Sequence, residues 1–398
     1  MQIKTLNLFD EKSVLNFLII SAIVFAATVN NLEGWSSLSS LCGIVFLFLL
    51  YLSNRSFYFL KALTPLVIFS VYSFLTFFWG GSLDYAQKVA TAILVGAAVL
   101  LGLRKKAISI EAVTFALILA GGLNIWSSRD NLVVADVDEY RVEGMIGNPN
   151  ALAIFLSLTA FVILYAPLKF PKITKLIAVF FMIYSLLFTG SRKGLFLIVV
   201  TILYGLCSYL FGSSKSRLKN LVRLLISVVL FISLVVLFFR APAVLDDLSQ
   251  VSVIGRTQHM LDGKHNVRYD MIAEGMRLWT ESPIFGWGAG QFAQLTIFQT
   301  YSHNNYVETL ANYGLFGFFL YYAFYLNLIQ RAVIQLRRAP KDSSTRSNSS
   351  TGLIMLIMLL VSEWGLVTLG SKSTWIFLMI AAFLVLSEQK SAQKFNSI

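Results

Sequence analysis

Long apolar runs recur from one end of the chain to the other, and short polar connections separate most of them. Each run holds roughly 17 to 20 mostly apolar residues without the alternation of a strand, which predicts helices long enough to cross a bilayer. We place these runs at residues 14–31, 35–52, 62–79, 86–103, 109–127, 149–166, 173–189, 193–211, 221–239, 305–328, 352–370 and 373–388. The predicted fold class is therefore all-α: a polytopic membrane protein of about 12 transmembrane helices in a single domain over residues 1–398, without internal repeats.

Two of the connections are long and lie on the outer side. Residues 128–148 form an acidic segment that ends at Asn148-Pro149, an N-cap followed by proline in the first helical turn. Residues 240–304 form a large outer loop between the ninth and tenth predicted helices, too long for a plain connector. Within it, the spacing from Tyr269 to Trp279 predicts an amphipathic helix at the membrane interface, with Trp279 and Trp287 at headgroup level.

The composition excludes a soluble globular protein, because 57% of the residues are hydrophobic, 13% are charged and the mean hydropathy is +0.72. If both termini are cytoplasmic, the inner segments hold 21 of the 32 Lys and Arg residues but 5 of the 20 acidic ones, as the positive-inside rule requires. The net charge of +12 therefore reports membrane topology, and its dispersal along helix flanks argues against a nucleic-acid partner. We expect the polar inner segment 337–351 to be a flexible loop.

The histidines and cysteines do not predict a metal site. His259 and His265 have no histidine four residues away, and Cys42 and Cys207 each fall inside a predicted helix. We expect both cysteines to behave as small buried apolar residues, and the protein to need neither a metal nor another cofactor.

Positive charges on the outer side depart from the positive-inside rule and therefore need a reason. Arg192 and Lys193 occupy a very short outer turn, where they either extend to lipid phosphates or hold an anion at the membrane surface. Arg268 and Arg277 lie nine positions apart on the predicted interface helix, so they face opposite sides of it. We expect Arg277 to pair with neighbouring carboxylates and Arg268 to be the better ligand candidate; Arg256, which precedes this helix, is another.

His303 stands directly before the tenth predicted helix. A neutral imidazole can accept a proton from a hydroxyl group near neutral pH, so His303 is a candidate general base; the alternative is amphipathic packing at the interface. Asn304 and Asn305 are explained either as helix caps, with Asn305 and Glu308 in the spacing of a capping box, or as ligands of a polar substrate. Asn148 is a further candidate of the second kind.

Two other features bear on chemistry. Glu363 lies inside the eleventh predicted helix, where a charge is costly, so we expect it to face the bundle interior with Lys88, Lys372 or an outer arginine as its partner. The turn from Gly286 to Gly290, "GWGAG", resembles a phosphate-binding loop, but it follows no predicted strand and is weak evidence for a phosphate site.

A set of short motifs resembles the O-antigen ligase and polymerase superfamily of bacterial membrane glycosyltransferases. The motifs are "GNPNALA" at Gly147–Ala153, "GSRKG" at Gly190–Gly194, Arg268, Trp279, Pro283, the Gly286–Gly290 turn, His303-Asn304 and Gly314-Leu315-Phe316-Gly317. They cover residues 145 to about 325, and the twelve-helix layout with a large outer loop after the ninth helix agrees with the family. The family commonly has glycine directly after the Ser-Arg pair, where this chain has Lys193.

The resemblance implies an enzyme of surface polysaccharide biosynthesis (O-antigen and lipopolysaccharide, capsule or exopolysaccharide) in the bacterial inner membrane. Such enzymes move a glycan from an undecaprenyl-pyrophosphate carrier to an acceptor saccharide on the outer side. Carried over residue by residue, Arg192 and Arg268 hold the pyrophosphate, and His303 activates the acceptor hydroxyl. Fixed arginines then replace a metal ion, and in-line attack inverts the anomeric centre. The remaining candidates for substrate binding are Lys193, Arg256, Arg277, Asn148, Asn304 and Asn305.

Within the family the acceptor separates two functions. A polymerase adds the growing chain to another lipid-linked repeat unit, whereas a ligase passes it to lipid A core or to a protein; we favour the polymerase. A membrane transporter is the alternative from an unrelated class. Transporters usually place their binding groups near the membrane midplane in repeated halves, whereas the polar candidates here gather at the outer face.

Overall fold

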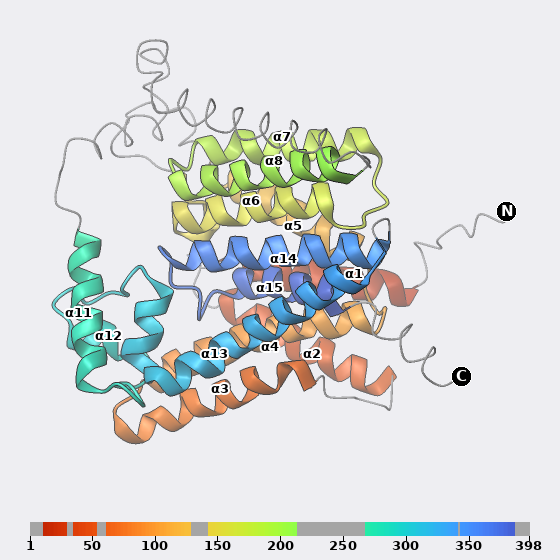
Figure 1. Ribbon diagram of the computed structural model, residues 1–398. Coiled ribbons are helices and arrows are strands. Elements are labelled where there is room, and N and C mark those ends of the chain that lie inside the picture. Colours follow the sequence, from red (N-terminus) through yellow and green to blue (C-terminus); the bar gives the residue numbers. More distant parts are fainter. Residues whose placement is uncertain are drawn as a thin grey trace, which may run out of the picture.

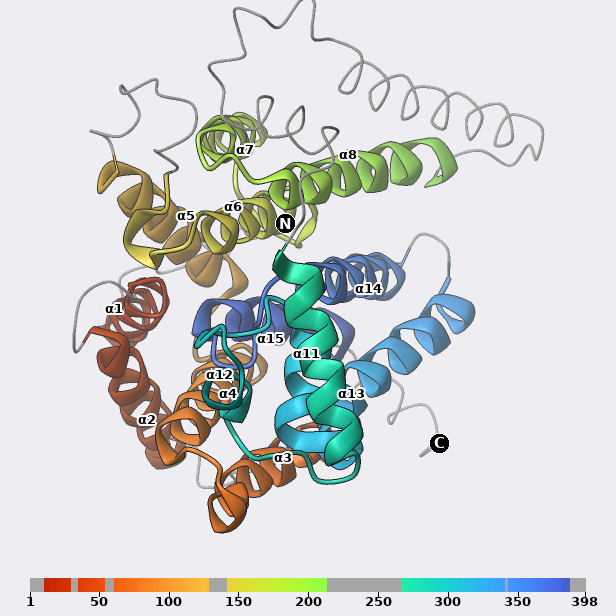
Figure 2. The same ribbon diagram turned by 90° about the vertical axis from the view of Figure 1, so that its left-hand side faces the viewer.

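The computed structural model describes residues 11–29, 35–53, 61–128, 142–212, 267–340 and 343–386. These residues form helices joined by turns and contain no strand, which confirms the all-α fold class. Most helices run side by side in one direction, and α11 (Val267–Glu281) lies across one end of this bundle together with the short α12 (Gln291–Leu295) (Figure 1). We call this the α11 end; Figure 2 looks onto it.

The bundle itself is built from two groups of helices that the outer loop separates in sequence. The first group is α1 (Glu11–Ala26), α2 (Trp35–Ser53), α3 (Thr64–Leu75) between the 3-10 turns η1 (Lys61–Leu63) and η2 (Thr76–Trp79), α4 (Leu83–Arg104), α5 (Ile110–Trp126), α6 (Pro149–Tyr165), α7 (Lys172–Leu187) and α8 (Arg192–Gly212). The second group is α13 (Asn305–Arg338), α14 (Ser344–Glu363) and α15 (Lys372–Leu386). A further 3-10 turn, η4 (Gly144–Ile146), leads into α6.

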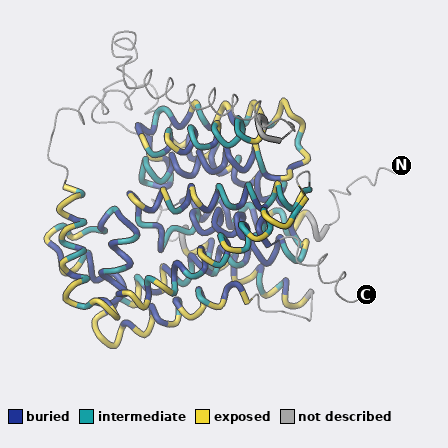
Figure 3. Tube along the Cα trace, in the orientation of Figure 1, coloured by how far each residue is buried: buried dark blue, intermediate teal, exposed yellow. Residues whose placement is uncertain are grey.

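Helices occupy eleven of the twelve predicted apolar runs; the remaining run, residues 221–239, lies outside the described residues. Within the described part of the chain, two helical stretches, Lys61–Trp79 and Leu83–Arg104, are long and apolar enough to cross a membrane. Five shorter apolar helices accompany them: Val14–Ala26, Ser37–Leu52, Ile110–Trp126, Pro149–Tyr165 and Lys372–Leu386. Large apolar side chains are also exposed, as on α7, where Phe180 is 70% exposed. Exposed positions lie along the outside of the bundle and buried ones in its interior (Figure 3).

The polar segment 337–351 is mostly helical, so the prediction of a flexible loop is wrong. α13 continues to Arg338, and α14 already begins at Ser344. The Ser343 hydroxyl oxygen accepts from the Arg346 N–H at 3.2 Å, and the Arg346 guanidinium donates to the Leu336 carbonyl at 2.6 Å. Serine and arginine thus satisfy the open ends of two adjoining helices, which a low-complexity composition does not reveal.

Glu363 is fully buried at the end of α14, which agrees with the prediction that it faces the bundle interior. The prediction of a cationic partner is wrong. No cation pairs with Glu363 in the described part of the chain. Its carboxylate instead accepts hydrogen bonds of 2.8–3.0 Å from the hydroxyl groups of Tyr321, Tyr322, Tyr325 and Thr368. Four hydroxyl donors solvate the carboxylate in the way that water would, so no lysine or arginine is needed inside the bundle.

α13 is interrupted near the α11 end. Gly314 has a φ of 62° and a ψ of −169°, which is not helical, and the backbone groups on both sides of it lose their partners within the helix. The glycine-rich turn takes over these bonds. Trp287 and Gly288 donate their N–H groups to the carbonyls of Ala311 and Asn312, at 3.0 and 2.8 Å.

The same turn is also hydrogen-bonded to η2 and to the start of α4, in the first group of helices. The Ala289 N–H donates to Thr76 Oγ1 at 3.0 Å, and the Ser82 N–H donates to the Ala289 carbonyl at 2.8 Å. Because the N–H groups of residues 287–289 are engaged within the protein, the turn is a structural clamp rather than a cradle for phosphate. It fastens the outer loop to both α13 and η2.

α11 confirms the helix predicted from Tyr269 to Trp279. Its buried face carries Met271 and Leu278, which join Phe292 of α12 and Ala311 of α13 in a small separate core. The Trp287 indole N–H donates to the Leu278 carbonyl at 2.9 Å. α11 is therefore held rigidly over the beginning of α13, close to the predicted site residues.

Candidate active site

The two upstream motifs meet at the α11 end. Asn148 caps α6, since its side-chain oxygen accepts from the N–H groups of Asn150 and Ala151 at 2.9 and 3.1 Å. The side chain of Asn150 in turn lies 3.0 Å from the Ser191 hydroxyl, and Ser191 is the residue before α8. This bond ties the first turn of α6 to the first turn of α8, where Arg192 and Lys193 stand.

The turn that carries His303 is strained and is held by its neighbours. His303 has a φ of 56°, in the left-handed region that residues other than glycine seldom adopt. On one side of it, the Ser302 N–H donates to the Glu308 carboxylate at 2.8 Å. On the other side, Asn304 caps α13 by accepting from the N–H groups of Tyr306 and Val307 at 3.0 and 3.2 Å.

The predicted capping box therefore differs in register from the one observed. Asn304, not Asn305, is the N-cap, and the carboxylate of Glu308 reaches back to Ser302. Asn305 is the first helical residue and is fully buried; its side-chain oxygen accepts from the N–H groups of Thr368 and Leu369 at 2.9 and 3.2 Å. Both asparagines thus help to position the chain through their side-chain oxygens.

One aromatic ring contacts the imidazole of His303, and two cations act on it electrostatically. The ring of Tyr301 lies 4.3 Å from the imidazole, centroid to centroid, and the Tyr301 hydroxyl oxygen accepts from the Asn148 amide at 3.2 Å. Burial, followed by the positive charges of Arg268 and Lys193, lowers the pKa of His303 to about 4. The imidazole is therefore neutral at physiological pH and can accept a proton.

Two of the cations predicted from the sequence, Lys193 and Arg268, act electrostatically on this histidine. Lys193 donates a hydrogen bond to the Gly365 carbonyl oxygen in the α14–α15 connection. The charges of Arg192 and Arg268 act on the Lys193 ammonium, and those of Lys193 and Arg268 act on His303. Lys193 and Arg268 thus act on His303, and Arg192 acts on Lys193, although these residues come from α8, α11 and the turn before α13. Several positive charges beside a neutral imidazole suit an anion.

Two of the predicted cations do not join this cluster. Arg277 is exposed on α11, where its guanidinium is paired with Glu274 at 2.7 Å and also with Glu281, as expected for surface pairing. The bond from Arg277 lowers the pKa of Glu274, which keeps that carboxylate charged. Arg256 lies outside the described residues.

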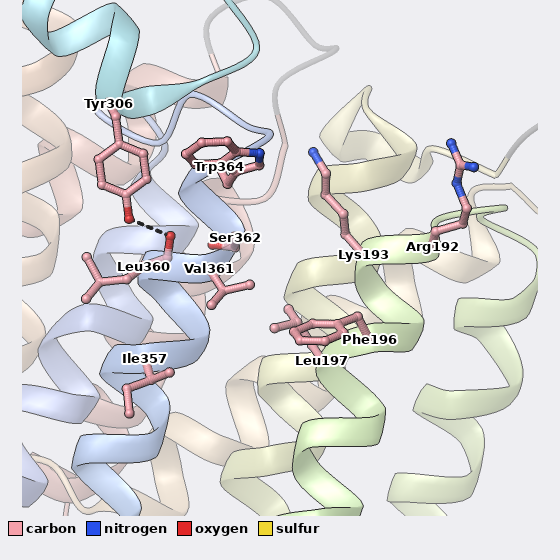
Figure 4. A pocket seen from close by; sticks show the side chains of 10 residues that line it. All are labelled: Arg192, Lys193, Phe196, Leu197, Tyr306, Ile357, Leu360, Val361, Ser362 and Trp364. Carbon is pink, nitrogen blue, oxygen red and sulfur yellow. Dashed lines mark hydrogen bonds between the residues drawn. The ribbon is translucent and has the colours of Figure 1, made fainter. Parts of the chain in front are cut away.

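A cavity of about 810 Å³ opens beside the cationic cluster (Figure 4). Arg192 and Lys193 stand at one end of it, at the start of α8. Its walls are apolar for most of their length and come from α8 on one side and α14 on the other, with Trp364 nearest Lys193 and Tyr306 bonded to the Leu360 carbonyl. The other lining residues are Phe196, Leu197, Ile357, Leu360, Val361 and Ser362. A charged mouth above an apolar groove suits an amphiphile with an anionic head.

The sequence did not predict a role for Tyr301 or Gly365. Each contacts a residue that is distant in the sequence: Tyr301 accepts from Asn148, and Gly365 accepts from Lys193. Asn150 and Ser191 do lie inside the two upstream motifs, so the motifs themselves contained the signal. No group of three or more His, Cys, Asp or Glu side chains in the described residues could hold a metal ion.

The comparisons with known proteins point to the same part of the chain. No curated protein matches the sequence. The family model described as O-antigen ligase matches residues 177–322, a segment that includes Arg192, Arg268 and His303. Proteins of this family are integral proteins of the bacterial inner membrane and act in polysaccharide biosynthesis. Residues 177–322 are thus similar to the O-antigen ligase family, which confirms the predicted resemblance to the O-antigen ligase and polymerase superfamily.

Proposed function

We propose that this protein is a metal-independent, inverting glycosyltransferase that moves a glycan from an undecaprenyl-pyrophosphate carrier to an acceptor sugar on the outer face of the bacterial inner membrane. The observation that carries this proposal is that Arg192 and Lys193 line the mouth of an apolar groove while Lys193 and Arg268 also act electrostatically on His303. We favour a polymerase, with a ligase as the second candidate because the matching family model is described as O-antigen ligase.

The donor fits the groove by its chemistry. Its polyprenyl chain would lie along the apolar walls of α8 and α14, and its pyrophosphate would meet Arg192 and Lys193 at the mouth. Arginine offers a planar fork of donors to phosphate oxygens, and lysine adds a compact charge. Arg268, which acts on the same lysine from α11, would complete the site.

The transfer then needs one base and one stabilised leaving group. The acceptor hydroxyl oxygen attacks the anomeric carbon of the donor glycan while the bond from that carbon to the pyrophosphate oxygen breaks. The hydroxyl proton passes to the neutral imidazole of His303, and the bonding electrons leave with the pyrophosphate. Its growing negative charge is stabilised by cations already in place, which lowers the barrier without a metal ion. The products are the glycosylated acceptor and carrier pyrophosphate, and attack from the side opposite the leaving group inverts the anomeric centre.

We place the α11 end, including the outer loop of residues 240–304, on the outer side of the membrane and both termini in the cytoplasm. The distribution of Lys and Arg in the sequence supports this orientation. The large apolar side chains around the bundle support a lipid-facing surface, since water would not stabilise them there.

Membrane vesicles loaded with lipid-linked repeat units from the host test the class of protein. Wild-type vesicles should lengthen or transfer the glycan, and His303→Ala should abolish transfer at unchanged protein level. Retained turnover in His303→Ala would remove the base assignment. Sugar that crosses the bilayer without a new linkage would instead indicate a transporter. A strong chelator should leave transfer unchanged, and inhibition reversed by a divalent ion would contradict the metal-free mechanism.

The two arginines of α11 offer a matched comparison. Arg268→Lys keeps the charge but loses the planar fork, and we expect transfer to fall by about 100-fold. Arg277→Lys makes the same change on the same helix, at a residue already paired with Glu274 and Glu281, and should be nearly silent. Equal effects of the two substitutions would contradict a role for Arg268 in donor binding.

Surface polysaccharides from a deletion strain separate polymerase from ligase. Products with a single repeat unit indicate a missing polymerase, whereas long chains that stay on the carrier indicate a missing ligase. The second outcome would overturn the preference for a polymerase and leave the glycosyltransferase assignment in place.

A further inference from the structure

Glu363 is a buried ionisable residue that the proposed mechanism does not use. Its side chain lies inside the bundle at the end of α14 and is fully buried. Buried ionic and polar networks can often be replaced by well-packed apolar side chains without loss of stability, so stability alone does not explain a glutamate here. An ionisable residue within a membrane-spanning helix points instead to a functional role, and the hydrogen-bond partners of Glu363 indicate which role it has.

Tyr322 links Glu363 to the start of α13. The Tyr322 hydroxyl donates to Glu363 Oε2 at 2.8 Å and accepts from the side-chain amide of Asn305 at 3.3 Å. A hydroxyl group has one proton and two lone pairs. Because the proton of Tyr322 is directed to Glu363, a lone pair of the same oxygen is available to the Asn305 amide. The hydrogen bonds therefore run in one direction, from Asn305 to Tyr322 to Glu363.

Thr368 forms a second link between the same two side chains. Its hydroxyl donates to Glu363 Oε1 at 3.0 Å, and its backbone N–H donates to Asn305 Oδ1 at 2.9 Å. The Leu369 N–H donates to the same Asn305 oxygen at 3.2 Å. Both ends of the Asn305 amide are thus bonded, which fixes its orientation. We call Glu363, Tyr322, Thr368 and Asn305 the Glu363 network.

The Glu363 network holds one side of the turn that carries His303. Asn305 is the first residue of α13 and stands two residues after His303, whose φ is 56°. A backbone of this kind persists only where the surrounding structure holds it. Glu308 holds the turn on one side, at Ser302, and Asn305 anchors the other side to the α14–α15 connection, residues 364–371. Without this anchor the turn could relax and move the imidazole.

The network also reaches the residues of the donor groove. Gly365, in the same connection as Thr368, accepts the hydrogen bond of Lys193. Tyr306, which lines the groove, stacks on the ring of Tyr322, with the centroids 5.2 Å apart and the planes inclined by 13° (Figure 4). The Glu363 network therefore connects the turn of His303 with the groove mouth, where the donor is proposed to bind.

Resting on the proposed function, we propose that Glu363 is a positioning residue, which holds His303 against the bound donor through Tyr322 and Asn305. Glu363 does not touch the substrates and takes no part in the proton transfer. Its role is to fix the distance from the imidazole to the reacting atoms, where a displacement of about 1 Å can slow a reaction by about 100-fold.

Tyr322 and Tyr325 offer a matched comparison. Both hydroxyl groups donate to Glu363 at 2.8 Å, Tyr322 to one oxygen and Tyr325 to the other. Within the described residues, the Tyr325 hydroxyl is not bonded to Asn305, whereas that of Tyr322 is. Each change to phenylalanine keeps the ring and removes one buried donor to the same carboxylate, so the two variants should lose similar amounts of thermal stability.

Transfer kinetics in membrane vesicles with lipid-linked repeat units separate the two tyrosines. Tyr322→Phe should lower kcat about tenfold or more and leave KM for the donor within about twofold, because it releases Asn305. Tyr325→Phe should leave both constants within about twofold, since Tyr321, Tyr322 and Thr368 still hold Glu363. Equal losses of kcat in the two variants would overturn the proposal, because kcat would then follow stability. Unchanged kcat in Tyr322→Phe would overturn it as well.

Glu363→Gln tests the same link if Tyr322→Phe does not fold. The remaining side-chain oxygen should face Tyr321, Tyr325 and Thr368, because all three donate to Oε1, and the new amide N–H groups then face Tyr322. The proton of Tyr322 loses its acceptor, so kcat should again fall about tenfold. Wild-type kcat in folded Glu363→Gln would contradict the positioning role.

A second readout separates this inference from the proposed function. Wild-type protein that transfers no glycan would contradict the proposed function and would leave the network to be tested by nuclear magnetic resonance of histidine-labelled protein. The ring signal of His303 should shift in Tyr322→Phe and stay in place in Tyr325→Phe. A signal that is unchanged in both variants, or shifted equally in both, would overturn the link from Glu363 to His303 whether or not transfer is observed.

Discussion

The imidazole of His303 should titrate far below the ordinary range of histidine in the free protein. Its pKa of about 4 reflects burial first and then the charges of Arg268 and Lys193. At pH 5.5, a histidine of ordinary pKa is neutral in about 9% of molecules, whereas one with a pKa of about 4 is neutral in about 97%. If His303 is the base, kcat/KM at that pH should be about tenfold higher than an ordinary histidine would permit.

Donor binding should change this behaviour. A pyrophosphate beside Arg268 and Lys193 compensates the charges that disfavour the imidazolium, so the pKa of His303 should rise toward its usual value. The acid limb of kcat, which reports the enzyme–substrate complex, should then lie at higher pH than the acid limb of kcat/KM, which reports the free enzyme. A base of higher pKa accepts a proton more readily, so the donor would activate the base that acts on the acceptor.

Nuclear magnetic resonance of protein labelled in its histidine rings measures this directly, with His303→Gln to assign the signal. We expect titration near pH 4 in the free protein and an upward shift of the midpoint with inorganic pyrophosphate. Arg268→Gln should raise the midpoint of the free protein, and Arg277→Gln, its control on the opposite side of α11, should not. A midpoint between about 6 and 7 in every sample would refute the reasoning, because it would show that burial and the cationic cluster do not act on His303.

The same shift has a consequence for stability. The unfolded chain takes up the proton of His303 near pH 6.5, whereas the folded chain does so only near pH 4. The contribution of this residue is therefore fully present above about pH 6.5 and is lost as the pH falls toward about 4.

Three further substitutions test the contacts that shape the site and the bundle. Gly365→Ala would place a methyl group over the Lys193 ammonium, so pyrophosphate binding should weaken about tenfold while the thermal midpoint stays the same; unchanged binding would show that this contact does not position Lys193. Glu363→Ala leaves four buried hydroxyl groups without their acceptor and should destabilise the protein by about 3 kcal/mol or more, whereas the exposed Glu143→Ala should not shift the thermal midpoint. Gly314→Ala sets a Cβ against the backbone of the outer loop, 2.6 Å from the Gly286 nitrogen, and should prevent α11 from docking, seen as faster proteolysis of the loop; normal protection would contradict the clamp.

The helices of the bundle could be predicted from the sequence because hydrophobic run length is a local property. Every predicted run within the described residues contains a helix, and the spacing of apolar residues alone predicted α11. The errors fell where polar residues build helix ends. The beginning of α14 is rich in serine and threonine, a composition that predicts a loop. The helix is instead stabilised by Arg346, whose guanidinium donates to a carbonyl in the last turns of α13.

The site was predictable to the extent that its chemistry is carried by rare residue types. Arg192 and Lys193 were candidates because the positive-inside rule disfavours cations on the predicted outer side. His303 was a candidate because the chain has only three histidines. What the sequence could not provide is the partner of each group. Glu363 was expected to need a cation, because hydroxyl groups give no charge signal in the sequence. Three tyrosines of α13 and Thr368 instead donate to its carboxylate.

The left-handed backbone conformation at residue 303 restricts which amino acids fit this position without strain. Besides glycine, the side chains that tolerate this conformation best are asparagine, aspartate and histidine. Of these, aspartate and histidine can take up a proton, and aspartate would set a negative charge beside the diphosphate that the neighbouring cations are proposed to hold. If His303 is the base, the shape of the main chain and the charge of the proposed donor therefore both favour histidine over aspartate at this position.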